Sequence, residues 1–160
     1  MIAVRAPAPK VTIVLPNDLT DLLADALGDA SDRIDNAGWC WCPGAGEYGI
    51  CADCAEQFDR AYRYRDYRAE ITELLDAGPR PVALAFDARS WQEIISGLGV
   101  GADQAADCVC LNCRHNDPCD DCAEQRCLAR AYRALQARLT LRLRRPRKPR
   151  GTRARSRGRR

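Results

Sequence analysis

The sequence has little of what enzyme active sites and membrane proteins are usually built from. Its 160 residues include one histidine, His115, and neither a Gly-x-Ser-x-Gly nucleophile turn nor a glycine-rich phosphate loop. No window approaches the roughly 18 consecutive apolar residues of a membrane helix. The N-terminal apolar run is too short, and too interrupted by prolines, for a secretory signal. We therefore expect a cytoplasmic, non-enzymatic protein with no membrane partner.

Cysteine, in contrast, is abundant, with ten residues in the chain. Because the cytoplasm is reducing, closely spaced cysteines there indicate metal ligands rather than structural disulfides. Eight of them form two groups with the same spacing, C-x-C-x8-C-x2-C, that lie 68 residues apart. The groups are Cys40, Cys42, Cys51 and Cys54, and then Cys108, Cys110, Cys119 and Cys122. The spacing predicts one four-cysteine site in each half of the chain.

The similarity of the two halves extends to both sides of the cysteines. "CADCAEQ" from residue 51 and "CDDCAEQ" from residue 119 both lead to "RAYR", after a two-residue insertion in the second half. Upstream, alternating apolar residues from Val11 and from Val82 predict two short strands. We expect an amphipathic helix after each strand, with Asp18 as the cap of the first and Ser90 at the start of the second. A shift of 72 residues would then align the apolar positions of these two helices.

A longer helix is expected after each cysteine group. The residues predicted for its apolar stripe are Phe58, Tyr62, Tyr67, Ile71 and Leu75 in the first half, and Leu128, Tyr132, Leu135 and Leu139 in the second. Units of about 65 residues can bury only a small core, which favours a metal staple and packing of the halves against each other. We predict an α+β fold of internally duplicated strand-helix-zinc loop-helix units, residues 9–77 and 80–141, packed as a pseudo-dimer with a disordered basic tail at 142–160.

The eight repeated cysteines are the predicted zinc ligands. A C-x2-C pair at the start of a helix suits Zn2+, because backbone N–H groups and the positive end of the helix stabilise thiolate charge there. Four thiolates close the coordination sphere, so we expect two structural zinc ions and no open position for a reactive water. In the second half, Cys113, Cys127 and His115 are further candidates, and Cys113 could replace Cys108.

Two other chemistries also use closely spaced cysteines. A thiol redox site would need a thioredoxin-like strand and helix, and the cysteines of "WCWCPG" are not spaced as C-x2-C. Iron–sulfur ligation by Cys108, Cys110 and Cys113 would need ferredoxin spacings, which the chain lacks. Metal analysis of the reduced protein separates both alternatives from zinc.

Two resemblances bear on fold and function. "PCDDC", residues 118–122, and "CAE", residues 54–56, resemble the two halves of the zinc nucleotide deaminase motif, which would imply a proton-transferring role for Glu56. Ile50 stands where the first copy would need the proline of that motif. The overall pattern of residues 10–141 resembles small uncharacterised cysteine-rich proteins of actinobacteria and their phages. That resemblance implies the fold and zinc binding, and it brings no activity.

Basic residues are concentrated at the C-terminal end. Residues 142–160 contain ten arginines, Lys148 and no acidic residue, whereas residues 1–141 contain 14 basic and 22 acidic residues, a net charge of −8. Such a tail cannot fold alone, and its natural partner is a phosphate backbone. The predicted nucleic-acid-binding residues are Arg144, Arg145, Arg147, Lys148, Arg150, Arg153, Arg155, Arg157, Arg159 and Arg160.

Together, the cysteines and the tail favour a non-enzymatic zinc-binding adaptor whose tail binds DNA or RNA and whose acidic body contacts a protein partner. The body alone, being negatively charged, should be repelled by nucleic acid. The alternative is a structural or protein-interaction module whose tail serves solubility or contacts an acidic partner. A deaminase-like or thiol redox enzyme is a third hypothesis.

Overall fold

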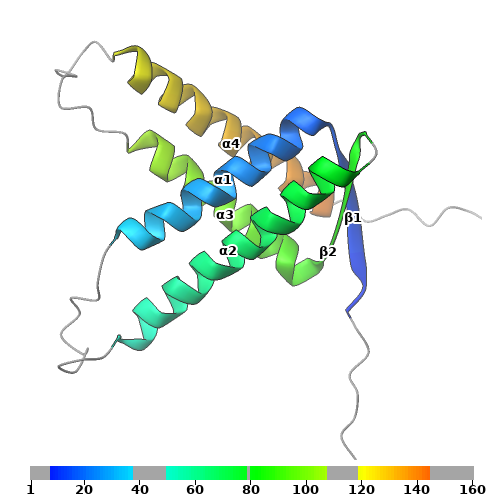
Figure 1. Ribbon diagram of the computed structural model, residues 1–160, viewed down its shortest axis with the longest axis horizontal. Helices are drawn as coiled ribbons and strands as arrows, with labels where there is room; N and C mark the ends of the chain where they lie inside the picture. The colour runs from blue at the N-terminus through cyan, green and yellow to red at the C-terminus, as the bar shows by residue number, and fades with distance from the viewer. Residues whose placement is uncertain (1–7, 38–49, 79, 108–118, 145–160) are drawn as a thin grey trace, which may run out of the picture.

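The computed structural model describes residues 8–37, 50–78, 80–107 and 119–144, and it has the predicted α+β class. A strand and two helices follow one another twice along the chain (Figure 1). The elements are β1 (Lys10–Leu15), α1 (Asn17–Asn36) and α2 (Ala52–Ala77), and then β2 (Val82–Asp87), α3 (Ala88–Ala106) and α4 (Asp120–Arg144). Helix dominates the described residues, and β1 and β2 form one two-stranded antiparallel sheet.

The sheet buries one face against the helices. The alternation predicted from the sequence is confirmed, and the buried strand residues are Ile13, Leu15, Val82, Leu84 and Phe86. Trp91 of α3 is fully buried behind them, with its ring edge-on to Phe86 at 5.3 Å between centroids. Its indole Nε1 donates a hydrogen bond to the carbonyl oxygen of Val11 at 2.8 Å. Trp91 therefore joins the second half of the chain to the first strand.

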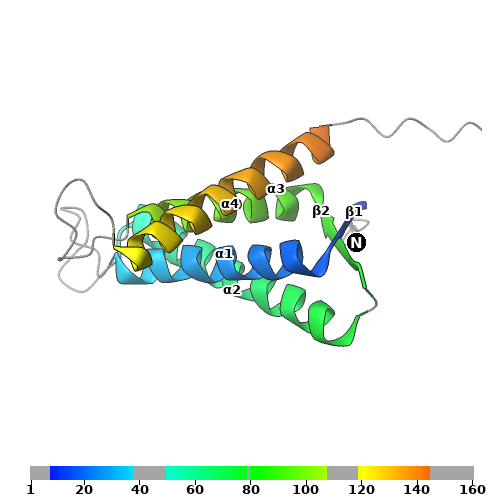
Figure 2. The same ribbon diagram turned by 90° about the horizontal axis from the view of Figure 1, so that it is seen from above.

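The two helices that follow the strands cross at the centre of the molecule. α1 and α3 pack on each other, α2 covers α1, and α4 covers α3 (Figures 1 and 2). The crossing is close because α3 presents glycines to α1. A Cβ built at Gly101 would lie 2.3 Å from the carbonyl oxygen of Ala26, and one built at Gly97 would lie 2.6 Å from Leu27 Cδ2. Only residues without a Cβ allow the backbones to approach this far.

The predicted starts of these two helices are wrong by a few residues. α1 begins at Asn17, and its N-cap residue is Pro16, whose carbonyl accepts the Thr20 hydroxyl at 2.9 Å, so Asp18 lies inside the first turn. α3 begins at Ala88, because the carboxylate of Asp87 accepts the backbone N–H of Ser90 at 2.8 Å and ends the strand there. The same N–H lowers the pKa of Asp87 below its usual range.

The predicted apolar stripe of α2 contains one wrong residue. Tyr62 is 62% exposed, whereas Tyr64 is fully buried. The repeated letters "RAYR" pair Tyr62 with Tyr132, but in burial Tyr132 corresponds to Tyr64, which precedes it by the cysteine shift of 68. Ile71 and Leu139 are buried at the same shift. The helices therefore need no insertion between them.

The shift of 72 predicted between the helices after the strands is also wrong. The buried residues of α1 recur in α3 at a shift of 71, the same shift that relates the strands. Corresponding buried pairs are Thr20 and Trp91, Leu23 and Ile94, Leu27 and Leu98, and Ser31 and Ala102. In each half, the strand and the helix that follows it therefore match the other half at a shift of 71. The cysteines match at a shift of 68, so the difference of three residues arises after α1 and α3.

Candidate functional site

The first C-x2-C pair lies at the N-terminus of α2. Cys51 is the N-cap residue, and its Sγ accepts the backbone N–H of Cys54 at 3.4 Å. The carbonyl of Cys51 accepts the N–H of Ala55 at 2.9 Å, which closes the first helical turn. Both cysteines are half-buried. This placement agrees with the predicted one, and it puts two sulfurs where helix N–H groups favour negative charge.

The second C-x2-C pair has the same relation to α4. Cys119 directly precedes the helix, and its carbonyl accepts the N–H of Ala123 at 2.9 Å, as the carbonyl of Cys51 accepts that of Ala55. Cys122 lies in the first turn and is buried. The two halves of the chain therefore present their C-x2-C pairs in matching local structure.

Both pairs lie at the end of the molecule remote from the sheet. In Figures 1 and 2, α2 and α4 begin at this end, where α1 and α3 finish. An ion pair of 2.7 Å between Arg33 and Asp107 joins the last turn of α1 to the residue that ends α3. The helix ends that carry the four described pair cysteines and the ends of the two central helices thus share one side of the fold.

The remaining predicted ligands lie outside the described residues. These are Cys40, Cys42, Cys108 and Cys110, together with the further candidates Cys113 and His115. Among the described residues, no three cysteine, histidine or acidic side chains come together as a metal site. Cys127 is exposed on α4, beyond the first turn that holds Cys122. The donors that are described, two thiols at each helix start, fit half of a four-thiolate zinc site in each half of the chain.

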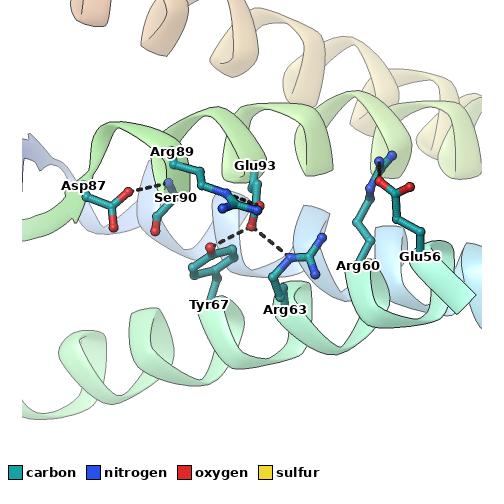
Figure 3. Close-up of polar contacts among 8 residues, drawn as sticks. All are labelled: Glu56, Arg60, Arg63, Tyr67, Asp87, Arg89, Ser90 and Glu93. Atoms are coloured by element: carbon teal, nitrogen blue, oxygen red, sulfur yellow. Dashed lines mark hydrogen bonds and ion pairs between the residues drawn. The ribbon is translucent and has the colours of Figure 1, made fainter. Parts of the chain in front are cut away.

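A carboxylate links α2 to α3 (Figure 3). Glu93 Oε2 accepts the hydroxyl of Tyr67 at 2.9 Å and Nε of Arg63 at 3.0 Å, and its other oxygen lies 3.4 Å from Nε of Arg89. Burial raises the pKa of the Tyr67 hydroxyl, and the bond to Glu93 adds to this. Glu56, the residue of the deaminase resemblance, is exposed and pairs with Arg60 at 3.5 Å. The bonds of Glu93 to Arg63 and Tyr67 join α2 to α3, whereas the pair of Glu56 and Arg60 lies within α2.

A second polar contact links α4 to α1. The hydroxyl of Tyr132 donates to Asp29 Oδ2 at 2.8 Å. Burial raises the pKa of Asp29 above its usual value, and burial together with the bond to Asp29 raises the pKa of Tyr132. Tyr64, which occupies the corresponding place in α2, is fully buried with no partner for its hydroxyl. Val100 follows Asp29 by the shift of 71, so the corresponding acceptor is missing.

Only one of the predicted nucleic-acid-binding residues is described. Arg144 is exposed and ends α4, so this helix includes the first three residues of the predicted tail. The other nine residues, Arg145, Arg147, Lys148, Arg150, Arg153, Arg155, Arg157, Arg159 and Arg160, lie outside the described part of the chain. α4 also exposes arginines that the sequence analysis did not single out, beginning at Arg126. The available signal was the absence of any acidic residue from Gln125 to Arg144.

No protein-family model, curated protein or solved structure matches this chain. The resemblances to deaminases and to actinobacterial cysteine-rich proteins therefore stay predictions. Within the described ranges, no helix is both long and apolar enough to cross a membrane.

Proposed function

We propose that this protein is a non-enzymatic zinc-binding adaptor that associates with nucleic acid. The observation that carries the zinc assignment is the repeated placement of a C-x2-C pair at a helix start, with Cys51 and Cys119 just before the helices and Cys54 and Cys122 in their first turns. The other four thiolates would be Cys40, Cys42, Cys108 and Cys110. Each zinc would be structural, joining the segment between two helices to the start of the second helix.

The proposal includes duplication of one unit, residues 9–77 and 80–141, packed as a pseudo-dimer. The corresponding burial at shifts of 71 and 68 supports it, as does the antiparallel pairing of β1 with β2. The Tyr132–Asp29 bond, whose counterpart Tyr64 lacks an acceptor, would mark divergence of the two copies. A unit that buries its apolar faces mainly against its copy would not be stable alone.

The adaptor role rests on the separation of charge. α1 exposes a row of aspartates to solvent, namely Asp18, Asp21, Asp25, Asp32 and Asp35, whereas residues 142–160 carry eleven basic and no acidic residues. A polyphosphate would be held by the basic end and kept off α1, leaving that helix to a protein partner in the cytoplasm. The alternative, a protein-interaction module with no nucleic-acid role, predicts no binding to DNA or RNA near physiological salt.

The zinc assignment is tested by metal analysis of the full-length reduced protein and two double variants. We expect two zinc ions in the wild type and one in each of Cys51→Ser/Cys54→Ser and Cys119→Ser/Cys122→Ser, because two of four ligands cannot hold the metal tightly. Cys127→Ser is the matched control, because it changes an exposed cysteine of α4, and it should keep two zinc ions. Iron in the wild type, or zinc content unchanged in both double variants, would contradict the assignment.

A further inference from the structure

The outer face of α4 carries an uninterrupted set of arginines. From Gln125 to Arg144 the helix has six arginines and no acidic residue. All six are exposed, and they are Arg126, Arg130, Arg133, Arg138, Arg142 and Arg144. The opposite side of the same helix is the buried one, with Tyr132, Leu135 and Leu139 in the core. Arg126, Arg130 and Arg138 lie on the side of α4 away from this buried stripe, whereas Arg133 and Arg142 lie at its edges, where they contact Asp103 of α3 and the carbonyl of Val14.

The corresponding stretch of α2 shows that the fold does not require this charge. Residues 57–76, which match 125–144 at the shift of 68, contain four arginines and five acidic residues. Three of those arginines have carboxylate partners, with Arg60 on Glu56, Arg63 on Glu93, and Arg65 on Asp35. The same position in the fold is therefore near neutral in α2, and its cations are paired within the protein.

The arginines of α4 are largely left to solvent. Among the described residues, one ion pair involves them, between Arg133 and Asp103 at 3.1 Å, and both side chains are more than half exposed. Arg142 donates from Nη1 to the carbonyl oxygen of Val14 at 3.0 Å, which leaves its charge unneutralised. Surface guanidinium groups without carboxylate partners are the usual donors to phosphate oxygens.

α4 is also placed where a long ligand can reach it. It is an outermost helix in both views, on the far side of α1 and α3 from α2 (Figures 1 and 2). At 1.5 Å per residue, the path from Arg126 to Arg144 is about 27 Å. That length matches several phosphates of a duplex, whose axis carries one negative charge per about 1.7 Å. Because the backbone of α4 fixes the spacing of these cations, they fit the regular phosphate spacing of a duplex, which is fixed as well.

We propose that the outer face of α4 is a binding surface for the phosphate backbone of duplex DNA. The inference rests on the proposed nucleic-acid role and places part of it in the folded body. It revises the expectation that residues 1–141 are uniformly repelled by nucleic acid, because their negative charge is concentrated on other helices, α1 above all. The contacts would be to phosphates and would carry no base specificity.

The test compares three charge-matched triple variants of the full-length protein. The helix variant is Arg126→Gln/Arg130→Gln/Arg138→Gln, the α2 control is Arg60→Gln/Arg65→Gln/Arg68→Gln, and the tail variant is Arg153→Gln/Arg155→Gln/Arg157→Gln. Each removes three positive charges, and glutamine keeps helix propensity close to that of arginine. Binding to a fluorescent 20-base-pair duplex and to a single-stranded RNA is measured by anisotropy from low to physiological salt, and circular dichroism verifies that each variant is folded.

We expect the helix variant to bind the duplex on the order of tenfold more weakly at physiological salt. The slope of the logarithm of the association constant against the logarithm of salt concentration should become about 2 to 3 less steep, because each phosphate contact contributes roughly 0.9. The α2 control should change affinity by no more than about twofold, which reports net charge alone. Equal effects in the helix variant and the α2 control, with loss only in the tail variant, would overturn the α4 surface and keep the proposed function. No duplex or RNA binding by the wild type would overturn both, and binding to RNA alone would overturn the duplex assignment.

Discussion

Gly101 is a position between α1 and α3 where one added methyl group should destabilise the fold. The Cβ of an alanine there would lie 2.3 Å from the carbonyl oxygen of Ala26, whereas carbon and oxygen atoms normally approach to no less than about 3.3 Å. The obstacle is backbone, so no side-chain rotation relieves it. α1 and α3 would have to separate by about 1 Å at their crossing, and a gap of this size forfeits a quarter to a half of the local dispersion energy.

The expected magnitude follows from two opposing effects. Overpacking of a core costs about 1 to 3 kcal/mol, and the upper part of this range applies because two helix backbones must move. Replacing glycine by alanine inside a helix returns about 1 kcal/mol of helix propensity. We therefore expect Gly101→Ala to lower the free energy of unfolding by about 2 kcal/mol, and the melting temperature by roughly 5 °C, since a chain of this size shifts by about 2 to 4 °C per kcal/mol.

Gly99→Ala is the matched control two residues earlier on the same helix. Its Cβ would meet Nε2 of Gln136 at 2.8 Å, the far end of a flexible side chain. Moving that group weakens one hydrogen bond, to the carbonyl of Ile95 at 2.9 Å, which roughly offsets the gain in propensity. Urea and thermal unfolding of both variants give the comparison. If Gly101→Ala were as stable as Gly99→Ala, the close approach of α1 and α3 would be refuted.

Two further predictions concern the buried tyrosines and their partners. Tyr64→Phe removes a buried hydroxyl that has no partner, so it should leave the free energy of unfolding unchanged or raise it by up to about 1 kcal/mol. Tyr132→Phe removes the bond to Asp29 and should lower the free energy of unfolding by about 1 to 2 kcal/mol. Urea unfolding measures both, and equal effects of the two variants would contradict the prediction. For Asp29, the pKa is raised in the folded state, so its favourable contribution is fully present below the unfolded value of 3.8 and is lost as pH rises through the folded pKa. Asp29→Asn keeps an acceptor for Tyr132, so it should be at least as stable as the wild type at pH 7 and lose any advantage near pH 3.5. Asp29→Ala should be less stable than the wild type at pH 7. If the advantage of Asp29→Asn grew as the pH fell, the predicted pH dependence would be wrong.

The elements of this fold could be predicted because strong local patterns define them. Alternation in the strands and the 3.6-residue period of the helices occur in both halves of the chain, so each half supports the prediction made for the other. The helix starts were harder to predict, because Asp87 and Ser90 are both good caps and only the end of β2 decides between them. Helix-capping propensity alone does not distinguish Asp87 from Ser90, and the place where β2 ends makes Asp87 the N-cap.

The wrong tyrosine in α2 had a signal in the sequence that the repeated letters concealed. Tyr62 lies nine residues before Ile71, half a turn out of phase on a helix of 100° per residue, so the two cannot share a face. Tyr64 lies seven residues before Ile71, which is two turns, and is buried. "RAYR" matches in letters, but burial follows the phase of the helix. A repeat should therefore be aligned by its periodic apolar positions before its identical residues.

The arginines of α4 were missed because charge was summed over a long segment. Residues 1–141 have a net charge of −8, and that sum predicts repulsion from nucleic acid. A ligand does not respond to the sum, because charges farther away than a Debye length of about 8 Å are screened at physiological salt. What it meets on the outer face of α4 is six arginines, of which one, Arg133, has an acidic partner among the described residues. Negative charge is therefore concentrated on helices such as α1, and positive charge already begins on α4, at Arg126.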